Sequence, residues 1–315
     1  MDSSTNANDR DQTAVALTIY RWTYVAQDQV LADCLQPALL ELRDGGALRS
    51  FWFNRFDARG PHLKILLTLP EPDKARVVRD LERRLAAYLR ENPETEPFSE
   101  EKAAERHANC QGKTLGEADR LPGLAERDTF VLTGHSSRDY PWLWSRDPGP
   151  ATPFWDRVSD LSWWTLDQVA DFSRSGGGRH GSALQLTHAV DRRLRQDQAW
   201  RTAFWRFCAS VLLHFLGGER FDDPAHCLTA FPPWIGDSNM KVFADVWDHL
   251  DRSETGIDGM EGLVREARAQ SDPDDDFRLL RETIFSGLSQ LGLPTRLRAT
   301  LFVFAWHRSL LEGEA

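Results

Sequence analysis

The first third of the chain alternates between strand-like and helix-like residue patterns, and their order restricts the fold more than any other feature. The strand-like segments alternate aromatic or β-branched side chains with polar ones, whereas the helix-like segments repeat Leu and Val with the helical period. Gly45-Gly46 and the turn-forming residues 57–61 (DARGP) separate neighbouring segments. The predicted elements are a strand over 16–24, a helix over 27–43, strands over 50–56 and 62–69, a helix over 70–90 and a strand over 128–133.

This order is typical of a ferredoxin-like sandwich, in which two helices cover one face of an antiparallel sheet. Residues 91–123 are rich in charged and turn-forming residues, so we expect an irregular insertion there, with a short helix over 99–110. The later part is helical, with helices predicted over 153–173, 182–217, 239–249, 259–270, 276–291 and 295–311. The sequence predicts an α+β protein with a disordered tail over 1–12, a ferredoxin-like region over 13–150 and a helical region over 151–315 that packs with it as one unit.

Composition and charge argue against several classes of function. Thirty-eight Lys and Arg against 48 Asp and Glu give a formal net charge of -10, which weakens any general attraction to nucleic acid or anionic lipid. The longest apolar stretches, 204–216 and 297–306, are interrupted by Arg or His and are shorter than the roughly 20 residues that a membrane span needs. Residues 1–12 lack the apolar segment of a signal peptide. We therefore expect a cytoplasmic protein that binds neither nucleic acid nor membrane.

Motifs for metal or phosphate binding are weak. Gly176 to Gly178 precede a predicted helix, as the glycines of an anion-binding loop do, but without the spacing of a Walker or dinucleotide-binding loop. A flexible connection between helices is therefore favoured there. The His residues and the four Cys residues show no metal-ligand spacing, so no metal site is predicted.

The densest group of polar and aromatic side chains lies on the predicted hairpin. Alternation along its first strand places Trp52 and Asn54 on one face and Arg55 on the other. His62 and Lys64 share a face of the second strand. Polar groups among aromatic residues need partners or a ligand, so these five residues are candidates for a site. Polar pairing between the strands, the ordinary use of such residues, is an equal alternative.

Basic residues recur along the predicted helix 70–90, on the side opposite its apolar stripe. Asp80 and Glu82 interrupt them, so a solvated surface is the ordinary interpretation. The alternative is docking of an acidic peptide, with Arg76, Arg79 and Arg83 as its contacts. The complete basic set is Lys74, Arg76, Arg79, Arg83 and Arg90.

The hairpin sequence FWFNRFDARGPHLKILL resembles the thiopeptide-type bacteriocin biosynthesis domain, which is related to the C-terminal elimination domain of class I lanthipeptide dehydratases. Further agreement comes from YRWTYVAQDQVLADCLQPALLEL, FWDRVSDLSWWTLDQVADF and LGLPTRLRATLFVFAWHRSLL. The resemblance extends over nearly the whole chain, although only the hairpin motif is specific. It implies an enzyme that modifies a ribosomally made peptide, and it implies no metal, nucleotide or redox cofactor.

The resemblance implies one of two activities. One type eliminates glutamate from glutamylated Ser or Thr, whereas the other, the pyridine synthase, joins two dehydroalanines in a formal aza-[4+2] cyclisation. In the elimination type, the second strand carries a motif similar to His-Leu-Arg-x-Arg, and a His lies four residues before a C-terminal Asn-Arg. At the corresponding positions this chain has Lys64, Leu66, Val303 and His307. It therefore lacks two guanidinium groups and a base of the elimination type, so the cyclase is favoured.

The cyclase interpretation implies particular partners and acid–base groups. The expected substrate is a leader-bearing precursor peptide with dehydroalanines and azoles, whose flat rings suit a chain with 12 Trp and 17 Phe. His62, His135 and Tyr140 lie on or just after predicted strands and are the candidates for donating a proton to the oxygen that is lost as water. Glutamate elimination and leader binding without catalysis are the alternatives. The oligomeric state is open, with a homodimer as one option.

Overall fold

The computed structural model describes residues 12–110, 123–134, 153–215, 237–253, 256–269 and 277–313. The chain divides into two compact units, residues 1–177 and 178–315. None of the described helices is long and apolar enough to cross a bilayer.

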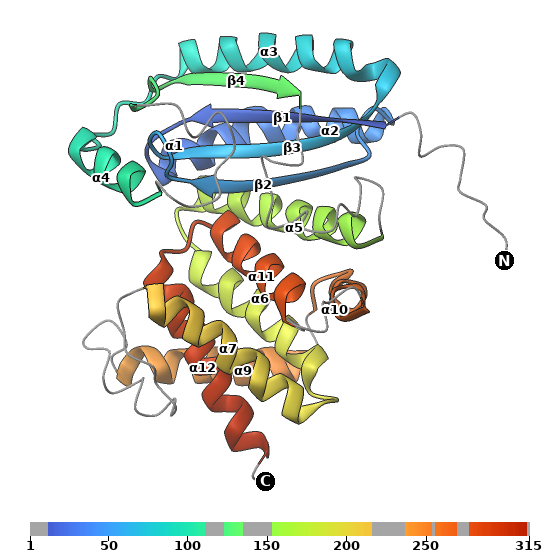
Figure 1. The fold of residues 1–315 in the computed structure, drawn as a ribbon, viewed down its shortest axis with the longest axis vertical. Helices are drawn as coiled ribbons and strands as arrows, with labels where there is room; N and C mark the ends of the chain where they lie inside the picture. The colour runs from blue at the N-terminus through green and yellow to red at the C-terminus, as the bar shows by residue number, and fades with distance from the viewer. Residues whose placement is uncertain are drawn as a thin grey trace, which may run out of the picture. The chain divides into compact units, whose positions relative to one another are not determined.

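The first unit contains a four-stranded antiparallel sheet with the strand order β2-β3-β1-β4 (Figure 1). Helices connect β1 to β2 and β3 to β4, whereas a short turn connects β2 to β3. This is the arrangement of a ferredoxin-like sandwich, so the predicted α+β fold class and the hairpin are confirmed. The strands are β1 (Gln12–Tyr20), β2 (Ser50–Phe56), β3 (His62–Pro70) and β4 (Thr129–Gly134).

One layer of helices packs on this sheet. Figure 1 shows α3 beside β4 and α5 beside β2, and both helices contact η2. The helix predicted over 99–110 is present as α4. The helices of the first unit are α1 (Tyr24–Gln29), η2 (Val30–Leu35), α2 (Gln36–Asp44), η3 (Glu71–Asp73), α3 (Lys74–Glu91), α4 (Glu100–Cys110) and α5 (Pro153–Ser175).

The connection from β1 to β2 is helical throughout, but its middle turn, η2, is a π-helix. Pro37 explains this widening, because it has no N–H and in a regular α-helix its ring would clash with the carbonyl of Asp33. The Gln36 N–H instead bonds to the Leu31 carbonyl, five residues back. The wider turn lets one helical connection continue past the proline.

The first strand lies earlier in the chain than the pattern predicted. It spans Gln12–Tyr20, so the predicted range 16–24 is wrong at both ends. A helix cap explains why the strand does not continue to residue 24, since the Thr23 side chain accepts a hydrogen bond from the Ala26 N–H at 3.2 Å and begins α1. Of the aromatic residues after Tyr20, Trp22 therefore lies in the connection between β1 and α1, and Tyr24 begins α1.

Helix α5 packs on the edge strand β2 and belongs to the first unit. The Phe51 N–H donates to the Ser159 hydroxyl at 3.1 Å, which satisfies a backbone donor on the open edge of the sheet. The Phe51 ring also meets the Trp163 ring edge-on at 4.4 Å. The sequence placed the boundary at residue 150, which would assign α5 to the helical region, whereas the first unit extends to residue 177 and includes α5.

The described part of the second unit is helical. The single helix predicted over 182–217 is wrong, because α6 ends at Leu194 and α7 begins at Gln198. Asp197 starts the second helix, since its carboxylate accepts the Trp200 N–H at 3.1 Å. The helices are α6 (Arg179–Leu194), α7 (Gln198–Phe215), α9 (Asp237–Ser253), α10 (Met260–Ala269), α11 (Arg278–Gln290) and α12 (Thr295–Gly313).

A buried ionic cluster joins three helices of the second unit. Arg201 of α7 donates two hydrogen bonds to Asp191 of α6, at 2.7 and 2.6 Å, and a third to Glu312 of α12 at 2.8 Å. The Trp205 indole N–H also donates to Asp191 at 2.8 Å. The Asp191 carboxylate is fully buried, and these charge-assisted hydrogen bonds compensate the cost of removing its charge from water.

Candidate functional site

The hairpin residues that the sequence singled out share the sheet face opposite the helices. Asn54 lies opposite Lys64 and Phe56 lies opposite His62 in the β2–β3 ladder. Opposed residues of an antiparallel pair point to the same face, and every second residue of a strand joins them there. Four predicted site residues therefore lie on one face: Trp52, Asn54, His62 and Lys64.

Arg55 lies on the other face, among the helices, as the alternation predicted. Its guanidinium donates to Asp28 of α1 at 2.6 Å and to Gln27 at 2.8 Å, and it lies 5.3 Å from the centre of the Tyr24 ring. Both charged side chains are 4% exposed, and burial lowers the pKa of Arg55 to about 10, so it stays charged at neutral pH. The structure does not bring Arg55 together with the other four residues. Its pair with Asp28 holds β2 to α1.

The His62 ring is held by the turn that precedes it. Nδ1 lies 2.8 Å from the Gly60 carbonyl oxygen. The ring stacks on Phe56 with centroids 5.8 Å apart and meets Tyr20 at 5.2 Å. His62 is fully buried. This imidazole therefore has a fixed orientation among aromatic rings.

A cation and an amide lie beside this imidazole. The Lys64 ammonium is 5.2 Å from the centre of the Phe56 ring, and Trp52 meets the same ring edge-on at 6.4 Å. The Asn54 amide oxygen accepts the Arg55 backbone N–H at 2.8 Å. Such a set offers hydrogen bonds, one positive charge and flat apolar walls. Trp52, Asn54, His62 and Lys64 are all buried, whereas Phe56 is half-buried.

Tyr20 is a member of this face that sequence analysis missed. Ile19 lies opposite Leu63, so the next residue of β1 points to the same side as His62. A phenol is a common acid–base group, and the ring contact with His62 places Tyr20 in the candidate site. Alternation along β1 contained this signal, because Tyr20 also lies within the strand that the sequence predicted over 16–24.

Two predicted acid–base residues, His135 and Tyr140, lie outside the described residues. Within the ranges that the structure describes, no three His, Cys, Asp or Glu side chains gather closely enough to hold a metal ion.

The predicted basic surface lies on the exposed side of α3, opposite its buried Leu and Val residues. Arg76 pairs with Asp73 at 2.8 Å, and Arg83 pairs with Asp80. The hydrogen bond from Arg83 holds the pKa of Asp80 below its usual value. Arg79 donates to a backbone carbonyl of its own helix. Carboxylates on or next to α3 thus offset part of the positive charge of this surface.

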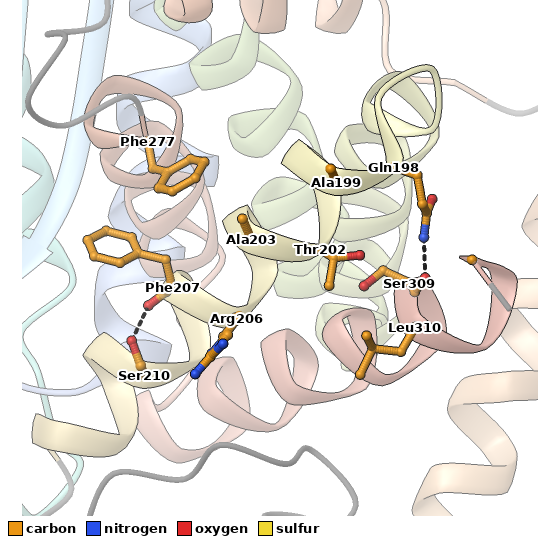
Figure 2. Close-up of a pocket in the computed structure, with 11 residues that line it drawn as sticks. Gln198, Ala199, Thr202, Ala203, Arg206, Phe207, Ser210, Phe277, Ser309 and Leu310 are labelled. Atoms are coloured by element: carbon orange, nitrogen blue, oxygen red, sulfur yellow. Dashed lines mark hydrogen bonds between the residues drawn. The ribbon is translucent and has the colours of Figure 1, made fainter.

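A cavity of about 800 Å³ lies in the second unit (Figure 2). One face of α7 forms a wall with Ala199, Ala203 and Phe207, and Phe277 and Leu310 face it. No His, Cys, Asp or Glu belongs to the described residues that line it. This cavity offers an apolar binding surface without an acid–base group of those types.

Comparison with known proteins agrees with this fold. Residues 15–114 match the family described as "Lantibiotic biosynthesis dehydratase C-term", which confirms the family resemblance over that range. A solved pyridine synthase, TbtD from thiomuracin biosynthesis, is similar with a TM-score of 0.66 and 18% identity, over 96% of this chain and 100% of that one. The tRNA-dependent lantibiotic dehydratase MibB from Microbispora sp. 107891 is similar with a TM-score of 0.52 and 15% identity, over 100% of this chain and 29% of that one. At these identities the likeness shows the fold. No curated protein matches the chain.

Proposed function

We propose that this protein is a pyridine synthase of ribosomal peptide biosynthesis. It would join two dehydroalanines of a leader-bearing, azole-containing precursor by a formal aza-[4+2] cyclisation, with loss of water and of the leader peptide. The observation that carries the proposal is the likeness in fold to a pyridine synthase over 96% of this chain and the whole of that one. The dehydratase also matches the whole of this chain, over 29% of its own length, but with a lower TM-score of 0.52.

Two apolar residues argue against glutamate elimination. By the family resemblance, Leu66 stands where the elimination type has an Arg, and Val303 stands where it has the His base. Both are buried, at 0% and 1% exposure, and neither binds a carboxylate or takes a proton. Lys64 is the cation that remains, and an ammonium acts as a point charge without the bidentate geometry of a guanidinium.

Cyclisation depends more on positioning than on strong acids or bases. An amide of the peptide must tautomerise to a 2-azadiene, and the two alkenes must lie face to face. Holding two reacting groups together contributes about 7 to 11 kcal/mol to such a step. The adduct must then lose water, for which His62, His135 and Tyr140 are the proposed acid–base set. Trp52 would provide a flat wall for the azoles.

The exposed arginines of α3 are proposed to dock the leader peptide. Changing Arg76, Arg79 and Arg83 together to Glu should weaken precursor binding several-fold at low salt and by less at high salt. Exposed ion pairs contribute only about 0 to 1 kcal/mol each and are screened by salt, so no single Arg is decisive. Fluorescence anisotropy of a labelled precursor measures the effect, and a leaderless substrate should react unchanged.

A matched control for this variant comes from two other helices of the same unit, α2 and α5. Arg43, Arg157 and Arg174 are also exposed and also pair with nearby carboxylates, so their reversal makes the same change in net charge. Binding should be unaffected by that control. If the α3 variant binds as the wild type does at low salt, the leader docks elsewhere, and the region of Arg192, Arg193 and Arg195 becomes the next candidate.

The products of the reaction separate the proposal from its alternatives. A cyclase releases the leader peptide and creates a pyridine, whereas an eliminase releases glutamate and leaves the leader attached. A protein that only binds the leader leaves the precursor mass unchanged. Mass spectrometry of a dehydrated, azole-bearing precursor before and after incubation distinguishes these three outcomes.

A further inference from the structure

The turn between β2 and β3 has an unusual backbone. Arg59 and Gly60 both have positive φ, at 59° and 105°. Such angles are uncommon for a residue other than glycine, so this geometry is maintained by the surrounding structure. It directs the Gly60 carbonyl back to the ring of His62, two residues later, at 2.8 Å from Nδ1.

Trp22 clamps this turn from one side. A Cβ atom on Gly60 would lie 2.9 Å from the indole nitrogen of Trp22, which is closer than real side chains approach. The indole is itself held in place, because Glu94 accepts the Trp22 backbone N–H at 2.8 Å and the Arg127 guanidinium lies 4.4 Å from the centre of its ring. From the other side, the Ala125 N–H donates to the Arg59 carbonyl at 2.8 Å. The turn therefore has little freedom to move.

The bond to Gly60 determines which nitrogen of His62 carries a proton. A carbonyl oxygen only accepts hydrogen bonds, so Nδ1 must be the donor. In the neutral imidazole the other nitrogen, Nε2, then holds the lone pair. Stacking on Phe56 and contact with Tyr20 keep the ring from rotating out of this arrangement.

We infer that this turn fixes neutral His62 as the Nδ1–H tautomer, so that Nε2 is the nitrogen that takes and returns a proton, with Gly60 and Trp22 as positioning residues. The use of Nε2 in catalysis rests on the proposed function, whereas the tautomer does not. When the ring acts as a base, Nε2 gains the proton and Nδ1 keeps its own, so the bond to Gly60 persists through the transfer.

Nitrogen NMR of the whole protein tests the tautomer without any substrate. A long-range proton–nitrogen correlation spectrum of protein with ¹⁵N-labelled His, recorded at alkaline pH, should show a protonated Nδ1 and an unprotonated Nε2 for His62. The His62→Phe variant assigns its signals among the nine His residues. A protonated Nε2, or two averaged nitrogen signals, would overturn the inference.

Two glycine variants test the role of the clamp. Gly46 also has positive φ, at 71°, but a Cβ there would meet nothing within 4 Å, so Gly46→Ala adds backbone strain without a clash. Gly60→Ala should shift the His62 nitrogen signals towards averaged values, whereas Gly46→Ala should leave them unchanged. An unchanged Gly60→Ala spectrum would remove Gly60 and Trp22 as positioning residues. If Gly60→Ala does not fold, Trp22→Phe, which removes the indole nitrogen from the contact, is compared in the same way.

The two proposals fail separately. An unmodified precursor together with a protonated Nδ1 would refute the cyclase and leave the tautomer standing. A new pyridine together with a protonated Nε2 would support the cyclase and refute the positioning role of this turn.

Discussion

Replacement of Asp28 by Ala is expected to lower the free energy of unfolding by about 3 to 5 kcal/mol. The Arg55 guanidinium is buried beside this carboxylate, with a nitrogen to oxygen distance of 2.6 Å, and its pKa of about 10 keeps it charged at neutral pH. Removing one partner of a buried pair leaves the desolvation cost of the other charge uncompensated. Urea unfolding followed by Trp fluorescence measures the loss.

Two controls separate this effect from simple truncation. The double variant Asp28→Ala, Arg55→Met removes the buried charge as well, so it should recover much of the lost stability. Asp160→Ala breaks an exposed pair with Arg157, in which both side chains are more than 40% exposed, and should cost about 0 to 1 kcal/mol. Equal losses for Asp28→Ala and Asp160→Ala would mean that the Arg55 pair is not a structural anchor.

At least one variant among His62→Phe, His135→Phe and Tyr140→Phe is expected to slow turnover by about 10²- to 10⁴-fold, the usual contribution of a positioned acid or base. Phe retains an aromatic ring at each position but donates and accepts no proton. Single-turnover rates of pyridine formation measure the effect. His249→Phe, at an exposed position of α9, is the control and should react like the wild type. Wild-type turnover in all three variants would remove this set from the mechanism.

The hairpin was predictable because alternation in a strand has a period of two. The pattern of 50–56 and 62–69 placed Trp52 and Asn54 on one face and Arg55 on the other, and the ladder has this arrangement. The order of strands and helices likewise predicted the sheet, since few folds suit that order. Periodicity therefore identified the face that carries each of these side chains.

Contacts between distant residues were not predictable in this way. Alternation gives the face of Arg55 but not its partner Asp28, which comes from a different element. The bond between His62 and Gly60 depends on two positive φ angles, and Arg59 gives no sequence signal for its own. Tyr20 lies within the predicted first strand, but its contact with His62 of another strand has no local sequence signal.

The most direct test of the central claim is mass spectrometry of a dehydrated, azole-bearing precursor incubated with the purified protein. The account predicts that the core peptide loses its leader and one water, and that a pyridine absorbance appears at the same rate. Release of glutamate with the leader still attached, or tight binding with no change in mass, would contradict it.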